Sequence, residues 1–111
     1  MSDLDRTFQA LSDATRRAIV MRLGAGPASV GELAQPHEMA LPSFLKHIGV
    51  LEEAGLIRTE KVGRVRTCRV ETKALRSVEQ WITGRRTMWE QHFDRLGAYL
   101  AAEAGAGKRK K

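Results

Sequence analysis

Ser43 and His47 are four residues apart, so a helix would place the hydroxyl one turn from the imidazole. A hydroxyl beside a base is the minimal arrangement for nucleophilic catalysis. Such a site also requires a group that orients the base and donors that stabilise an oxyanion, and neither is evident in the sequence. A glycine-rich phosphate loop and a paired-carboxylate motif are missing as well. We therefore expect a protein that is not an enzyme.

Metal binding would have to use Cys68 and three histidines, which are His37, His47 and His92. These residues are predicted on different elements and lack the close spacing of the usual transition-metal motifs. We therefore expect no metal and no other cofactor. A single cysteine excludes an intrachain disulfide and suits a reducing cytoplasm. We interpret Cys68 as a small packed strand residue, with a redox switch as the alternative.

Positive charge is the remaining chemical signal. The net charge is +6, and residues 41–70 carry six basic and three acidic side chains. Residues 108–111 are all basic, but such a tail is usually only solvated. The excess within 41–70 predicts a polyanionic partner. We expect a cytoplasmic protein without a membrane partner, because there is no signal peptide and no apolar run approaches the roughly 18 residues that span a bilayer.

Short helices are predicted ahead of the basic region. Residues 3–11 have the apolar spacing of an amphipathic helix. Asp13 is a good N-cap for a second helix, "ATRRAIVMRL". Ser29 and Glu32 form a capping box, so a third helix is predicted to begin at Val30. Pro36 breaks that helix.

A fourth helix is predicted over residues 42–54, in the stretch "LPSFLKHIGVLEEAGLI". Pro42 suits the first helical position, which makes Leu41 the N-cap. Leucine cannot cap, so the first backbone N–H groups lack a side-chain partner. Gly55 ends the helix.

A β-hairpin is predicted next, because "LIRTEKV" and "VRTCRVE" flank Gly63-Arg64 and are rich in β-branched residues. Its basic side chains are Arg58, Lys61, Arg64, Arg66 and Arg69.

A long helix is predicted over residues 73–103, with a wide apolar stripe. The stripe exceeds what packing on a small domain requires, which predicts a coiled-coil-like seam with a second subunit. The alternative is packing on the protein's own first helix. Residues 105–111 are predicted to be a disordered basic tail.

The element order is therefore helix, helix, helix, helix, hairpin and long helix, a mainly α fold with a small β-hairpin. Two short helices joined by a tight turn and followed by a basic hairpin are the layout of a winged helix-turn-helix, which we place in one domain over residues 1–104. DNA phosphate would offset the repulsion between the clustered arginines of the wing. The alternative of another class is a winged-helix module for protein interactions.

The segments "LSDATRRAIVMRL", "SVGELA", "LPSFLKHIGVLEEAGLI" and "EKVGRVRTCRV" resemble the ArsR-type family of bacterial winged-helix repressors over residues 4–100. The resemblance implies a homodimer that binds a dyad-symmetric operator in double-stranded DNA and blocks transcription. It also implies that the first and last helices form the dimer. Together with the apolar stripe it predicts an interface of Leu4, Phe8, Leu75, Ile82, Trp89, Phe93, Leu96 and Leu100.

Many members of this family sense metals, but their ligands are not matched here. In "ELAQP", Ala34 and Pro36 occupy the positions of one family cysteine pair. Another family site uses a histidine with a second histidine or a glutamate three residues later on the last helix. Here His92 is followed at that spacing by Arg95, which is not a metal ligand. A metal- or redox-responsive repressor and an unidentified small-molecule inducer between the long helices stay as alternatives.

The fourth helix has two faces on a helical wheel. Phe44, Ile48 and Leu51 share one arc and are predicted core, whereas Lys46 lies opposite. Leu41 and Leu45 fall between these arcs, and the resemblance implies that their positions face the DNA groove. We expect His47 to pack or to hydrogen-bond within the domain. The predicted DNA-binding residues are Leu41, Pro42, Ser43, Leu45, Lys46, Arg64 and Arg66.

Overall fold

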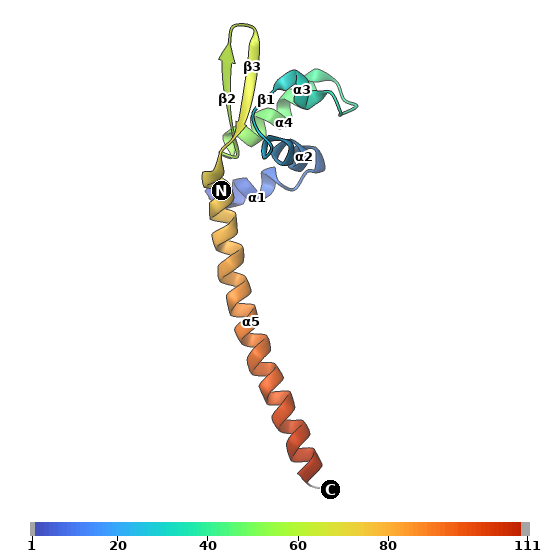
Figure 1. Cartoon of the computed structure of the whole chain (residues 1–111), viewed down its shortest axis with the longest axis vertical. Coiled ribbons are helices and arrows are strands. Elements are labelled where there is room, and N and C mark those ends of the chain that lie inside the picture. Colours follow the sequence, from blue (N-terminus) through green and yellow to red (C-terminus); the bar gives the residue numbers. More distant parts are fainter. Residues whose placement is uncertain (1, 110–111) are drawn as a thin grey trace. The chain divides into compact units, whose positions relative to one another are not determined.

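The computed structural model describes the backbone of residues 2–109 and the side chains of residues 2–105. It divides into two units, residues 1–78 and residues 79–111. Figure 1 shows the elements, which confirm the predicted mainly helical winged helix-turn-helix. In chain order they are α1 (Asp3–Ala10), α2 (Ala14–Leu23), β1 (Ala28–Ser29), α3 (Val30–Ala34), α4 (Leu41–Glu53), β2 (Ile57–Val62), β3 (Val65–Val70) and α5 (Thr72–Arg109).

The predicted helix starts of α2 and α3 are confirmed. Asp13 caps α2, because its carboxylate accepts a hydrogen bond from the backbone N–H of Arg16 at 3.1 Å. The Ser29 hydroxyl accepts from the backbone N–H of Glu32 at 3.1 Å and thereby caps α3. These two caps fix where α2 and α3 begin.

Helix α4 begins one residue earlier than predicted. Its N-cap is Ala40, so Leu41 and Pro42 are its first two helical residues, and Leu41 is not the cap. The prediction was wrong by one position because proline fits the second helical position as well as the first. The helix ends at Glu53, one residue before the predicted end, and Gly55 follows the Ala54 C-cap with a φ of 74°, a conformation that favours glycine.

The sheet has three antiparallel strands in the order β1-β3-β2, one more than the predicted hairpin. Val62 and Val65 face each other across the turn, where Gly63 has a φ of 63°. The strand that was missed, β1, pairs Ala28 with Cys68. In Figure 1 the hairpin of β2 and β3 extends away from α1 and α2.

The core of residues 1–78 gathers side chains from all of its elements except α5, and Leu75 of α5 packs against it half-buried. Phe44, Ile48 and Leu51, the predicted inner face of α4, are all buried and are therefore confirmed as core. The other buried apolar members are Ala10, Ile19, Leu23, Ala28, Leu33, Leu56, Ile57 and Cys68.

Within residues 79–111, helix α5 continues to Arg109, beyond its expected end near residue 103. Of the predicted disordered tail, residues 110–111 lie outside the described residues. The apolar side chains of this unit are exposed: Trp81, Ile82, Met88, Trp89, Phe93, Leu96, Tyr99 and Leu100. Among the described helices, none is long and apolar enough to cross a membrane.

Candidate nucleic-acid interface

The first turns of α4 carry the predicted DNA-binding side chains on the surface. Leu41 is 55% exposed and Leu45 is 38% exposed, although the neighbouring Phe44 is fully buried. Ser43 and Lys46 are exposed as well, as is Pro42. The helix therefore presents a mixed apolar and basic face to solvent while its other face anchors it in the core.

The N-terminus of α4 is also unusual in its backbone. Among the described residues, no side chain caps this helix. The first helical hydrogen bond runs from the N–H of Phe44 to the carbonyl oxygen of Ala40, at 3.1 Å. The N–H groups of Leu41 and Ser43 come before it and have no side-chain cap. Uncapped N–H groups and the positive end of the helix dipole favour an anion such as phosphate at this end.

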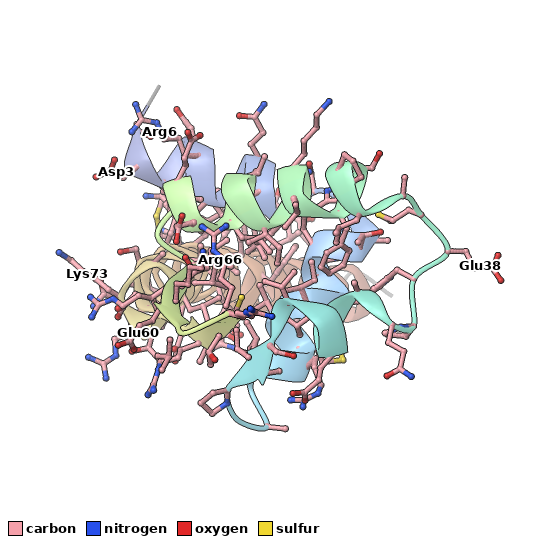
Figure 2. All side chains as sticks on the ribbon, turned by 90° about the horizontal axis from the view of Figure 1, so that it is seen from above. Asp3, Arg6, Glu38, Glu60, Arg66 and Lys73 are labelled. Carbon is pink, nitrogen blue, oxygen red and sulfur yellow. The ribbon has the colours of Figure 1, made fainter. Side chains whose placement is uncertain are left out.

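A groove of about 550 Å³ separates this part of α4 from the wing. Its apolar lining comes from Leu41, Leu45 and Val30. The wing contributes the positively charged Lys61 and Arg66 and the neutral Thr59. In Figure 2, Arg66 lies inward over the body of the fold, whereas Glu60 points outward. The groove thus combines apolar contact with cationic groups, which suits the sugar–phosphate backbone and base edges of DNA.

The guanidinium of Arg66 already contacts two side chains of its own chain. Its Nη2 atom donates a hydrogen bond to Oγ1 of Thr59 at 3.3 Å and lies 3.9 Å from Oε1 of Glu52. The Thr59 hydroxyl in turn donates to the other carboxylate oxygen of Glu52. Neither the motif nor the spacing of these residues indicated this network, because it joins three separate elements.

The tip of the wing is different. Arg64 is exposed beside Gly63, and within the described part of the chain it has neither a hydrogen bond nor an ion pair. At the base of the wing Arg58 pairs with Glu71 at 3.3 Å. Arg64 can therefore meet a phosphate without losing a partner, and it does so from the tip of the wing.

His47 is held within the domain, as expected. The guanidinium of Arg16 donates to its Nδ1 atom at 3.2 Å, and Oδ2 of Asp13 lies 3.8 Å away. The hydrogen bond from the backbone N–H of Arg16 lowers the pKa of Asp13 below its ordinary value. The Nδ1 atom of His47 therefore faces Arg16 and Asp13 of its own chain. In the described chain no three His, Cys, Asp or Glu residues gather in a way that could hold a metal.

Cys68 is a buried member of the core and lies opposite Ala28 and Thr59 in the sheet. Burial raises the pKa of its thiol, so the reactive thiolate is disfavoured near neutral pH. We expect iodoacetamide at pH 8 to alkylate the folded protein at least about tenfold more slowly than the protein in denaturant, as followed by intact mass. Equal rates would contradict the packed interpretation and reopen the redox alternative.

The geometry defines a winged helix-turn-helix protein with an exposed, mixed apolar and basic helix N-terminus. A helix-turn-helix domain family matches residues 11–60. A crystal structure of an ArsR family transcriptional regulator is 55% identical, with a TM-score of 0.76, over 79% of this chain and 91% of that one.

Two named transcriptional regulators are also similar in sequence. The HTH-type transcriptional regulator Rv2034 of Mycobacterium tuberculosis is 42% identical over 71 residues, which cover 64% of this chain and 66% of that protein. The transcriptional repressor SdpR of Bacillus subtilis is 28% identical over 79 residues, which cover 71% of this chain and 88% of that protein. The chain belongs to the ArsR family of winged helix-turn-helix transcriptional regulators, which are not enzymes.

Proposed function

We propose that the protein is a cytoplasmic homodimeric repressor that binds a dyad-symmetric operator in double-stranded DNA. The observation that carries this proposal is the first part of α4, where Leu41, Leu45 and Lys46 are exposed on a helix whose N-terminus has no side-chain cap. The similarity to a named transcriptional repressor supports repression as the outcome of binding.

The contacts follow from the chemistry of each group. Leu41 and Leu45 meet thymine methyl groups or the wall of the major groove. Lys46 and Ser43 bind phosphate or a base edge, and the uncapped N–H groups beside Pro42 receive a phosphate. Arg64 and Arg66 extend the contact along the wing, but Arg66 must first leave Glu52.

The dimer is proposed to form through α1 and α5. In the second unit, Ile82, Trp89, Phe93, Leu96 and Leu100 are exposed at spacings of three, four and seven residues, which is the pattern of a helix seam. In the first unit Phe8 is 37% exposed and Leu4 is half-buried. Leu75 packs in part against the core of its own chain, so its share in the interface is the smallest.

Arg64→Ala should weaken binding to every DNA sequence by a similar factor and lower the slope of log K against log salt by about 1. The reason is that a phosphate contact releases counterions but reads no base. Titration by fluorescence anisotropy at several salt concentrations measures both effects. Arg58→Ala is the matched control, because Arg58 is already paired with Glu71 and its loss should leave the slope unchanged. An unchanged slope for Arg64→Ala would remove the tip of the wing from the interface.

The proposed function itself is tested by the same titration on the unmodified protein. Binding should fall steeply as salt rises, because phosphate contacts dominate the affinity of DNA-binding proteins. A protein that shows no binding at low salt is a protein-interaction module instead.

A further inference from the structure

We propose that Glu52 competes with DNA phosphate for Arg66 and thereby lowers the contribution of the wing to DNA affinity. The inference rests on the proposed DNA-binding function. It makes Glu52 and Thr59 positioning residues, which act through Arg66 and do not need to touch DNA themselves.

The contacts among Glu52, Thr59 and Arg66 place a carboxylate where it can compete with a DNA phosphate for the guanidinium. A carboxylate and a phosphate both offer anionic oxygens to a guanidinium, so one can replace the other. Glu52 lies near the end of α4, and Arg66 lies on β3, where it lines the groove beside Leu41 and Leu45. The hydroxyl of Thr59 links the two, because it donates to Glu52 and accepts from Nη2 of Arg66. Arg66 is therefore held at the proposed interface by an internal anion.

The pair is weak enough to be displaced. The ion pair is long, at 3.9 Å, and the side chains of Arg66 and Glu52 are 48% and 41% exposed. Exposed pairs of this kind are screened by solvent and contribute little to stability. A phosphate that approaches the groove can take Arg66 from Glu52.

The register of the hairpin explains why an internal anion is useful here. Lys61 lies directly opposite Arg66, on the same face of the sheet, and both line the groove. Like charges that face each other across two strands repel. Glu52 offsets this repulsion when no DNA is bound, at the expense of the attraction that Arg66 would exert on DNA.

The exchange has a distinctive salt dependence. A free arginine that binds phosphate releases counterions from the DNA, which steepens the salt dependence by about 0.9 per contact. If Arg66 exchanges Glu52 for phosphate, an exposed ion pair that salt weakens must also be broken, and this offsets part of the ion release from the DNA. Arg66 should therefore contribute less to the salt slope of the unmodified protein than an arginine without an internal partner would.

The decisive experiment is a double-mutant cycle on Glu52 and Arg66, read as affinity and salt slope with one fixed DNA duplex. Glu52→Gln should bind about 3- to 10-fold more tightly, with a steeper slope, because Arg66 is released and its full phosphate contact is restored. Arg66→Ala alone should lower the slope by less than the roughly 0.9 of an uncontested phosphate contact. The double variant should have the slope of Arg66→Ala, since Glu52 acts through that residue.

Two further variants separate this mechanism from simple removal of negative charge. Thr59→Val keeps every charge and deletes the linking hydroxyl, so binding should tighten about twofold without a change in slope. Glu53→Gln removes the neighbouring carboxylate, which lines a different pocket with Arg6 and Arg16, and should leave the slope unchanged. Thermal unfolding of each variant checks that the fold is intact, and Thr59→Val keeps the proposal testable if Glu52→Gln is unfolded.

Three results would overturn the inference. One is a gain from Glu52→Gln that persists in the Arg66→Ala background. Another is a loss of about 1 in slope from Arg66→Ala alone, which would show an uncontested phosphate contact. The third is weaker binding by Thr59→Val, which would mean that the network presents Arg66 to DNA. Failure of the unmodified protein to bind DNA refutes the proposed function instead, whereas binding that Glu52→Gln leaves unchanged refutes this inference alone.

Discussion

Replacing Trp89 and Phe93 together by glutamate should convert the protein to a monomer and lower its affinity for an operator with two half-sites about 100-fold or more. Both side chains are exposed in α5 and belong to its apolar stripe. A seam between two copies would bury them, and buried unpaired carboxylates are strongly unfavourable. Without the dimer each half-site must be bound separately, so the advantage of a linked second contact is lost.

Analytical ultracentrifugation and anisotropy with one-half-site and two-half-site duplexes measure this prediction. Gln80→Glu with Gln91→Glu is the matched control, since it adds the same charge at exposed positions on the opposite side of α5. The control should stay dimeric and bind as the unmodified protein does. A monomeric Trp89/Phe93 variant with full operator affinity would show that the proposed dimer is not what binds DNA.

Phe44→Ala and Leu45→Ala should have opposite consequences although the residues are adjacent. Phe44 is fully buried, so its truncation leaves a cavity and should lower the free energy of unfolding by about 3–5 kcal/mol. Leu45 is 38% exposed at the edge of the groove, so its truncation should cost less than about 1.5 kcal/mol. The same change should weaken operator binding severalfold, because the apolar contact with the groove is lost.

Urea denaturation and operator titration on both variants test this comparison. The binding of Phe44→Ala must be measured well below its unfolding transition, where the folded fraction is close to one. If Leu45→Ala binds the operator as tightly as the unmodified protein, the exposed leucines are not part of the reading surface.

Local signals in the sequence located two helix starts correctly, although the start of α4 was predicted one residue too late. Asp13 and Ser29 cap the helices that they were predicted to cap, since a capping hydrogen bond spans only three residues. The two-residue strand β1 was missed because a strand that short has no periodicity, and Ser29 also serves as the cap of α3. Its pairing with β3 is a tertiary effect that no local pattern announces.

In the candidate site, too, some features could be predicted from the sequence and others depend on tertiary packing. Helical periodicity placed Leu41 and Leu45 between the buried and the exposed arc of α4, whereas the family resemblance implied that they face outward, and the structure leaves both exposed. The engagement of Arg66 by Glu52 and that of His47 by Arg16 depend on how separate elements pack. The sequence showed that the wing is basic, but it could not distinguish Arg64, which has no partner among the described residues, from Arg66, which contacts Thr59 and Glu52.

Selection of bound DNA from a random pool tests the central claim most directly. The proposed repressor should enrich one sequence with two inverted half-sites whose centres lie about 10 base pairs apart, one helical turn, because a two-fold dimer places its two recognition helices on the same side of the duplex. Enrichment of single unpaired half-sites would contradict the dimeric reading of an operator, and a pool that shows no enrichment at low salt would contradict sequence-specific DNA binding itself.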